Sequence, residues 1–216
     1  MQRKSIRVLI TCLLLLGSIT FNSCMQIFML KMGMRSPHIM NDNRHARYLK
    51  EFDAPKESAY LLDSNYLYFL DINDTTQFRV EKKNHYQPIQ AIYYGHEQFQ
   101  EAWFINCYAP GYPKLNWNID NNFASFPPTS AAPLDTLVSF DRLIKHATAY
   151  KNHEKSKVGK DQPYTVVFIW NRFMIRESRS LHQQIKENLK MCKEPYRIIY
   201  INNDNIFVDA DMEKSK

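Results

Sequence analysis

The sequence predicts an α/β fold, because two buried strands flank an amphipathic helix near the C-terminus and a β-hairpin lies upstream. Residues 164–170 (YTVVFIW) and 196–202 (YRIIYIN) are almost continuously apolar, as in strands that are covered on both faces. Between them, residues 177–192 carry apolar side chains at helical spacing. A strand, a helix and a strand in this order predict two parallel strands joined by a right-handed crossover, the βαβ half of the domain at 163–204.

The preceding half, residues 42–150, begins with a predicted helix. Asn41 or Asp42 can cap a helix that runs to Phe52, where Asp-Ala-Pro ends it. Residues 59–72 are rich in aromatic side chains and are expected to hold a strand and a short helical piece. Residues 73–85 are polar and are expected to form a loop.

The hairpin is the clearest element of this half. Residues 89–94 and 99–107 are β-prone and flank the turn sequence Gly-His-Glu-Gln at 95–98. Residues 107–132 are rich in Pro, Gly, Asn and Ser and predict a long surface loop, a kind of segment that usually has a function. An amphipathic helix is expected at 134–147, followed by a charged linker at 151–162 that leads into the βαβ half.

Composition supports one globular domain and excludes a nucleic-acid-binding surface. The chain has 216 residues, of which 44% are hydrophobic and 13% aromatic, so it can bury a sizeable core. Its formal net charge is +6, but Arg3, Lys4 and Arg7 contribute half of that at the extreme N-terminus. The remaining charges are spread along the chain without the basic stripe that nucleic-acid binding requires.

The first 24 residues have the features of a secretory signal. The basic residues at positions 3, 4 and 7 precede an almost wholly apolar stretch at 8–19, and small residues stand near Cys24. The segment resembles a lipoprotein signal, which implies that residues 1–23 are removed and Cys24 is acylated. Phe21 and Asn22 depart from the usual pattern before the cysteine. This resemblance implies a lipidated tether at 24–41 and a single α/β domain at 42–216.

An uncleaved membrane anchor is the alternative for this segment. The chain stays apolar beyond Cys24, and residues 8–30 together are about long enough to span a bilayer as one helix. The polar residues between 18 and 26 weaken this alternative. Both interpretations place the rest of the chain outside the cytoplasm.

The composition and the loose signal resemble those of lipoproteins from Bacteroidota-type bacteria. Surface-exposed members of that group usually carry an acidic cluster after the lipidated cysteine, whereas Met-Gln-Ile-Phe follows Cys24 here. We therefore expect the protein to be anchored to a membrane of the cell envelope, with the outer membrane favoured, and to face the periplasm.

Residues 166–177 (VVFIWNRFMIRE) resemble the active-site segment of membrane-anchored thioredoxin-like proteins. In that family an apolar strand ends in Trp, and a Cys-x-x-Cys motif follows at the start of a helix. Trp170 matches the tryptophan and Phe173 the aromatic residue before the first cysteine. Met174 and Glu177 stand at the two cysteine positions. Since neither side chain can form a thiolate, the resemblance implies a redox-inactive domain.

The order of the elements differs from that of thioredoxin. In thioredoxin the βαβ unit comes first and is followed by a helix, the hairpin and a final helix. Here a helix, the hairpin and another helix come first, which is the order that a circular permutation gives. The resemblance then implies that Pro88 takes the place of the cis-proline beside the active-site turn, although a proline at a strand start is also ordinary.

Two cysteines remain as candidates for thiol chemistry. Cys107 and Cys192 could pair in an oxidising compartment, or could be two separate thiols. The histidines show no spacing to Cys or acidic residues that would indicate a metal site, and no motif indicates a cofactor.

Three functions are consistent with these patterns. The first is a non-catalytic domain that contacts an unknown protein partner, through the aromatic loop at 108–128 and the turn at 171–177. The second is a thiol–disulfide oxidoreductase that uses Cys107 and Cys192. The third is a lipid- or peptide-binding domain, which requires a deep apolar pocket.

We expect the Cys24→Ala variant to lose incorporation of a labelled fatty acid, because the thiol that would carry the acyl chain is gone. The Cys12→Ala variant, altered within the signal itself, should keep the label. Fatty-acid labelling of the protein in growing cells measures both, and label retained by Cys24→Ala would contradict lipidation at this residue.

Overall fold

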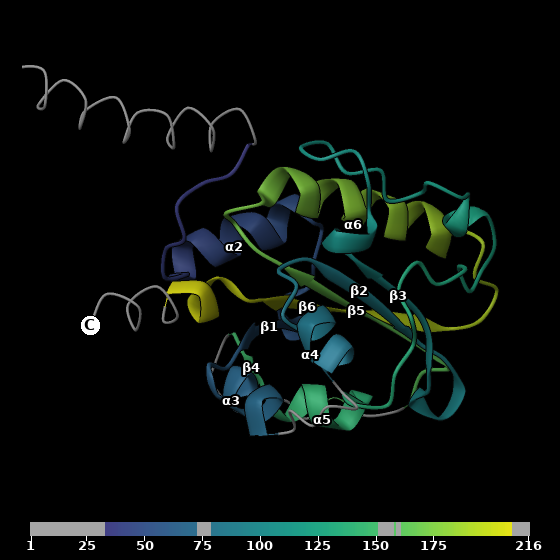
Figure 1. Ribbon diagram of the computed structural model, residues 1–216, viewed down its shortest axis with the longest axis horizontal. Coiled ribbons are helices and arrows are strands. Elements are labelled where there is room, and N and C mark those ends of the chain that lie inside the picture. The colour runs from purple at the N-terminus through teal and green to yellow at the C-terminus, as the bar shows by residue number, and fades with distance from the viewer. Residues whose placement is uncertain (1–32, 73–78, 151–157, 159–160, 209–216) are drawn as a thin grey trace, which may run out of the picture.

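The computed structural model describes residues 33–72, 79–150, 158 and 161–208. These residues form an α/β domain of three layers, in which helices cover both faces of one mixed sheet (Figure 1). The predicted signal, Cys24, the first part of the tether and most of the linker at 151–162 lie outside the described residues.

The sheet has six strands in the order β3-β2-β5-β6-β1-β4. β5 pairs in parallel with β6 and β6 in parallel with β1, whereas β2 is antiparallel to both β3 and β5, and β4 is antiparallel to β1. The predicted hairpin and βαβ unit are therefore confirmed, and they are joined where β2 meets β5. The strands are β1 (Ala59–Leu62), β2 (Gln90–Tyr94), β3 (Gln100–Ile105), β4 (Ala147–Ala149), β5 (Tyr164–Trp170) and β6 (Tyr196–Asn202).

The helices are divided between the two faces of the sheet. α2 and α6 cover one face, and α3, α4 and α5 cover the other (Figure 1). The predicted cap of the first helix is confirmed, since the Asn41 side chain accepts a hydrogen bond from the Arg44 amide at 3.1 Å. The labelled helices are α2 (Asp42–Glu51), α3 (Asn65–Ile72), α4 (Arg79–His85), α5 (Phe140–Lys145) and α6 (Ile175–Leu189), with 3-10 turns η1 (Lys56–Ser58), η3 (His96–Gln98), η4 (Asn106–Tyr108) and η5 (Asn122–Ala124). Residues 204–208 after β6 are also helical.

Two predictions of local structure were wrong. The polar segment 73–85 contains α4, which is held in place because His85 stacks on Trp103 at 4.3 Å between ring centroids. The helix predicted at 134–147 is shorter in the structure, where only α5 (Phe140–Lys145) is helical in this segment. Asp135 accepts hydrogen bonds from the Leu137 amide and from the His85 ring, contacts that a helix through this point would not make. Residues 147–149 instead add β4 to the sheet.

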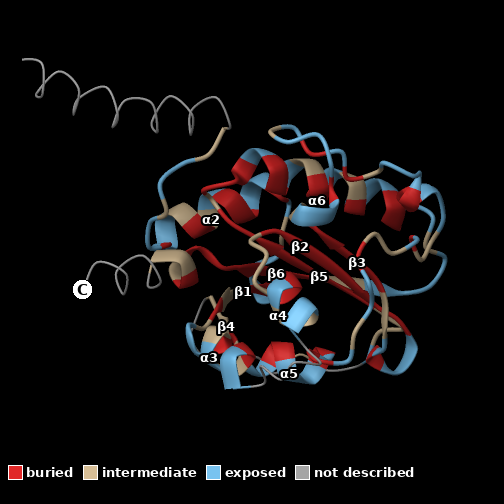
Figure 2. Cartoon of the chain, in the orientation of Figure 1, coloured by how far each residue is buried: buried red, intermediate tan, exposed pale blue. Residues whose placement is uncertain are grey.

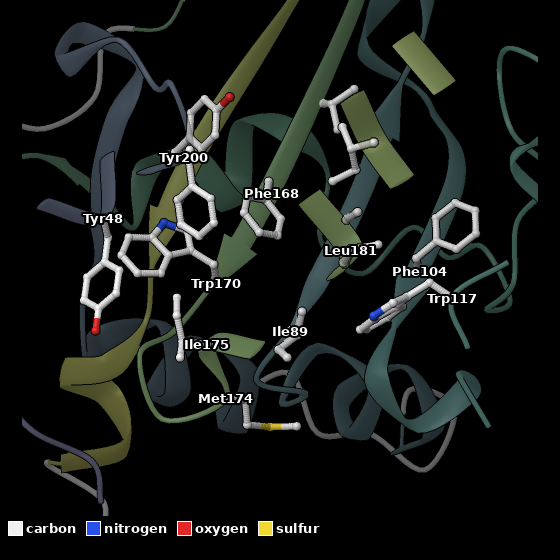
Figure 3. Packing of buried hydrophobic residues seen from close by; sticks show 14 of the residues in the cluster. Tyr48, Ile89, Phe104, Trp117, Phe168, Trp170, Met174, Ile175, Leu181 and Tyr200 are labelled. Atoms are coloured by element: carbon white, nitrogen blue, oxygen red, sulfur yellow. The ribbon is translucent and has the colours of Figure 1, made fainter. Parts of the chain in front are cut away.

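The core follows from the alternation of side chains along the buried strands. Along β5, Val166, Phe168 and Trp170 pack beneath α2 and α6, while Val167 and Ile169 pack against α3 and α5. Figure 2 shows the central strands buried between the helical layers. Trp170 is fully buried beside Tyr48 (Figure 3), with ring centroids 5.5 Å apart. The Phe52 ring centroid lies 5.0 Å from that of Trp170.

Two buried histidines lie within the layer beneath α2 and α6. The His45 ring lies against Tyr150, with centroids 4.2 Å apart, and the His182 ring stacks on Phe168 at 5.4 Å. Burial lowers the pKa of each histidine to about 4. Both rings are therefore neutral in the folded protein at neutral pH.

We predict that the free energy of unfolding falls as the pH decreases from about 6.5 to about 4. The pKa of each histidine is lower in the folded than in the unfolded chain, so the unfolded chain takes up protons first and is favoured. Each residue contributes up to about 3 kcal/mol to this loss, which is complete below pH 4.

Urea unfolding between pH 4 and 8 measures the effect. A His45→Gln/His182→Gln variant should show a shallower pH dependence than the wild type, whereas His96→Gln, altered at an exposed surface histidine, should keep the wild-type slope. Equal slopes in the double variant and the wild type would refute this account.

Candidate interaction surface at the carboxyl end of the sheet

The turn that follows β5 is fixed by one buried amide side chain. Asn171 is fully buried, and its Nδ2 donates to the Pro88 carbonyl at 2.8 Å. Its Oδ1 accepts a hydrogen bond from the Met174 amide at 2.8 Å, at the point where α6 begins. Asn171 therefore holds Met174, the residue that immediately precedes α6, and at the same time ties it to the chain that enters β2.

Residues at the end of β6 hold the same turn from its other side. The Asn203 Nδ2 also donates to the Pro88 carbonyl, at 2.9 Å, and the Asp204 carboxyl accepts a hydrogen bond from the Arg172 amide at 2.7 Å. Burial raises the pKa of the Asp204 carboxyl. The turn between β5 and α6 is thus held rigidly at the carboxyl ends of the parallel strands, where open α/β sheets usually bind ligands.

Met174 and Glu177, which the resemblance places at the two Cys-x-x-Cys positions, pack and form hydrogen bonds within the domain. Met174 immediately precedes α6 and is buried in the core beneath it (Figure 3). Glu177 is buried in the first turn of α6, where its Oε2 accepts a hydrogen bond from the Leu115 amide at 3.0 Å. Its Oε1 accepts another from Arg176 Nε at 2.9 Å. Glu177 therefore connects the long loop to α6.

Pro88 lies beside this turn, but the peptide bond before it is not cis, so the cis-proline that the thioredoxin resemblance implies is not present at this position. The cis peptide bonds of the described residues are Tyr112–Pro113 and Phe126–Pro127. The contact with the turn is made by the Pro88 carbonyl, which accepts hydrogen bonds from the two asparagine side chains.

Of the two alternatives for Cys107 and Cys192, the structure has separate thiols, which lie at opposite ends of the sheet. Cys107 follows β3 at the end where β5 finishes, since Gln90 pairs with both Ile105 and Ile169. Cys192 lies beside Tyr164, where β5 starts. The seven residues of β5 span roughly 20 Å, whereas a disulfide needs Cα atoms within about 7 Å. Both thiols are free.

Neither thiol has the environment of a reactive cysteine. Desolvation raises the pKa of the Cys107 thiol and that of the Cys192 thiol, so both favour the protonated form. The separation of these two thiols and their raised pKa values therefore argue against dithiol chemistry that uses Cys107 and Cys192 together.

The two surfaces that the sequence analysis singled out, the loop at 108–128 and the turn at 171–177, lie together. The Arg176 guanidinium donates to the Pro113 carbonyl, next to Tyr112, which is 47% exposed. The Tyr112 hydroxyl in turn donates to Met34 Sδ at 2.9 Å. We name this region the turn surface and define it by five residues: Met34, Tyr112, Pro113, Arg172 and Arg176.

The described part of the predicted tether is packed onto this surface. The Arg35 amide donates to the Phe173 carbonyl at 2.8 Å, and Arg172 Nη1 donates to the Ser36 carbonyl at 3.1 Å. Met40 is buried in the core. Residues 33–41 therefore belong to the domain rather than to a free spacer.

The aromatic residues of the loop divide into buried and exposed members. Trp117 and Phe123 are buried, with the Phe123 ring stacked on Phe104 at 4.2 Å between centroids. Phe126 is half-buried against Tyr164. Tyr112, by contrast, is exposed.

Sequence reasoning missed Asn171, Asn203 and Asp204 as the residues that organise this edge. They stand directly after the two buried strands, and that position was the available signal, because the carboxyl ends of parallel strands meet at one edge. The partner of both asparagines, Pro88, is more than 80 residues away in sequence and could not be assigned from the pattern.

No protein-family model, curated protein or solved structure matches this chain. Within the described residues, no helix is long and apolar enough to cross a membrane, and no group of three or more His, Cys, Asp or Glu residues is placed to hold a metal ion. The functional interpretation therefore depends on the geometry of the domain.

Proposed function

We propose that this chain is a membrane-anchored lipoprotein of the bacterial cell envelope whose domain acts through protein contacts at the turn surface, without thiol–disulfide chemistry. The observation that carries the proposal is the convergence of the long loop, the β5–α6 turn and residues 33–36 on one surface. Arginine and tyrosine, the residues exposed there, are enriched at the energetic centres of protein interfaces.

A permuted thioredoxin-like arrangement is the second part of the proposal. Its support is that the hairpin β2-β3 lies beside β5 of the βαβ unit, and that Pro88 contacts the turn after β5. Relative to thioredoxin, the hairpin precedes the βαβ unit in sequence. On this alignment the positions of the reactive thiols hold Met174 and Glu177, which pack and form hydrogen bonds instead.

Membrane anchoring would keep the turn surface close to a bilayer. Gly33 lies beside Arg176 of that surface, because a Cβ built on Gly33 would be 3.1 Å from the Arg176 guanidinium carbon. The nine residue steps from Cys24 to Gly33 can span at most about 30 Å. A lipid on Cys24, or an uncleaved helix at 8–30, would therefore present this surface to partners in or near the same membrane, for which we favour the periplasmic side of the outer membrane.

Site-specific cross-linking in intact cells tests the proposed surface. A photoreactive phenylalanine analogue is placed at Tyr112, which is exposed on the turn surface, and separately at Lys145 of α5 on the opposite side of the sheet. We expect a discrete cross-linked protein from position 112 and none from position 145. The Arg172→Glu/Arg176→Glu change should reduce the adduct from position 112 at least fivefold.

The folding of each variant is checked by urea unfolding of the purified protein. Equal adducts from positions 112 and 145, or an adduct from position 112 that ignores the arginine substitutions, would contradict the assignment of the turn surface as the site of contact.

A further inference from the structure

A small polar cavity lies at the carboxyl edge of the sheet, on the face covered by α3 and α4 (Figure 1). Its lining includes Tyr66 of α3, His85 at the end of α4 and Asn203 directly after β6. Each of these three residues is no more than 4% exposed. The cavity leaves about 10 Å³ for the centre of a water molecule, which is about the least space that holds one.

Each of these three side chains has one polar atom without a hydrogen-bond partner among the described residues. The three atoms are the Tyr66 hydroxyl, His85 Nδ1 and Asn203 Oδ1. The other polar atoms of the last two side chains are bonded, because His85 Nε2 lies 3.0 Å from the Asp135 carboxyl and Asn203 Nδ2 donates to the Pro88 carbonyl at 2.9 Å. Buried polar atoms nearly always have a partner, and where the protein supplies none an ordered water does so.

The bonds already made determine what the remaining atoms can do. The Pro88 carbonyl can only accept, so the Asn203 amide nitrogen faces it and Oδ1 is left as an acceptor. The Asp135 carboxyl accepts from His85 Nε2, so Nδ1 of the neutral ring is an acceptor as well. The Tyr66 hydroxyl can donate. Two acceptors and one donor match a water molecule, which donates two hydrogens and accepts at its oxygen.

The Tyr66 hydroxyl belongs to the same buried polar cluster as His85. Burial raises the pKa of the Tyr66 phenol above its usual value, and the neighbouring Tyr94 and Asp135 side chains add to the rise. Asp135 is also the residue that holds His85 Nε2. The phenol is therefore protonated at neutral pH, and its proton can be donated to an oxygen atom in the cavity.

We propose that this cavity is a binding site for a single water molecule, which donates to His85 Nδ1 and Asn203 Oδ1 and accepts from the Tyr66 hydroxyl. The water joins α3, α4 and the segment after β6. Because Asn203 also holds the Pro88 carbonyl, the water connects the two helices to the network that fixes the β5–α6 turn. This site goes beyond the proposed function, since it depends on no partner at the turn surface.

The chemistry of the lining favours water over a cation or an organic ligand. Among the described residues, no Asp or Glu lines the cavity, whereas Ca²⁺ and Mg²⁺ sites in proteins use carboxylate oxygens. The Asp135 carboxyl is engaged by the far nitrogen of His85. Organic ligands occupy pockets of roughly 300 Å³ or more, which this cavity does not approach.

The first test is urea unfolding of Tyr66→Phe, made in the full chain in dodecyl maltoside micelles. The substitution removes one hydroxyl and keeps the ring. If that hydroxyl bonds the water, its loss removes a buried hydrogen bond, and we expect the equilibrium constant for unfolding to rise about three- to tenfold.

Tyr93→Phe is the matched control. The Tyr93 hydroxyl is also buried and without a partner among the described residues, but Tyr93 packs beneath α6 and does not line this cavity. Removal of a buried hydroxyl that nothing bonds relieves its desolvation, so the constant should stay at or below the wild-type value. A constant for Tyr66→Phe that does not exceed that of Tyr93→Phe would overturn the proposal.

A high-resolution crystal structure of the full chain is the second test, because it shows the occupant directly. We expect density for one water within about 3.2 Å of His85 Nδ1, Asn203 Oδ1 and the Tyr66 hydroxyl. A direct hydrogen bond from Tyr66 to His85 Nδ1, with no density between them, would overturn the proposal even if Tyr66→Phe is destabilised. Density with ligand distances of roughly 2.4 Å would show a metal cation and would overturn it too. None of these results changes the cross-link expected from Tyr112, which tests the proposed function separately.

Discussion

The Pro88 carbonyl oxygen joins the two halves of this domain. It accepts hydrogen bonds from Asn171, at the end of β5, and from Asn203, at the end of β6. Pro88 itself leads into β2, so this contact connects the hairpin half to the βαβ half beyond the pairing of β2 with β5. The two asparagines are buried, and removal of either would leave buried polar groups without partners, which is costly.

The turn that this contact fixes determines what the carboxyl edge of the sheet can do. Asn171 accepts a hydrogen bond from the Met174 amide just before α6, and the side chains of Met174 and Glu177 are used for packing and for holding the long loop. The outward groups of the same turn, Arg172 and Arg176, bind carbonyl groups of residues 33–41 and of the loop.

Sequence periodicity predicted the elements whose own sequences carry a regular apolar pattern. β5, α6, β6 and the hairpin were found because each carries an uninterrupted pattern, and α2 was found because of its cap. α4 and β4 were missed because their own sequences are polar or short, and their stability comes from contacts with Trp103 and β1. Tertiary contacts of this kind leave little trace in local propensity.

The candidate sites were predictable to a smaller extent. The sequence identified the loop and the turn at 171–177 but could not show that they meet, since Arg176 and Pro113 are 63 residues apart. It left open whether Cys107 and Cys192 pair, and the register of β2 with β3 and β5 places these two residues at opposite ends of the sheet. The cavity at the carboxyl edge could not be predicted from the sequence either, because its polar lining comes from α3, α4 and the segment after β6.

The central claim is that buried hydrogen bonds from Asn171 hold the turn and join the two halves. Urea unfolding of Asn171→Ala tests it most directly, with Asn43→Ala on the exposed face of α2 as the matched control. The account predicts a loss of roughly 2–3 kcal/mol in the free energy of unfolding for Asn171→Ala and a change of no more than about 0.5 kcal/mol for the control. A loss for Asn171→Ala as small as that of the control would contradict the account.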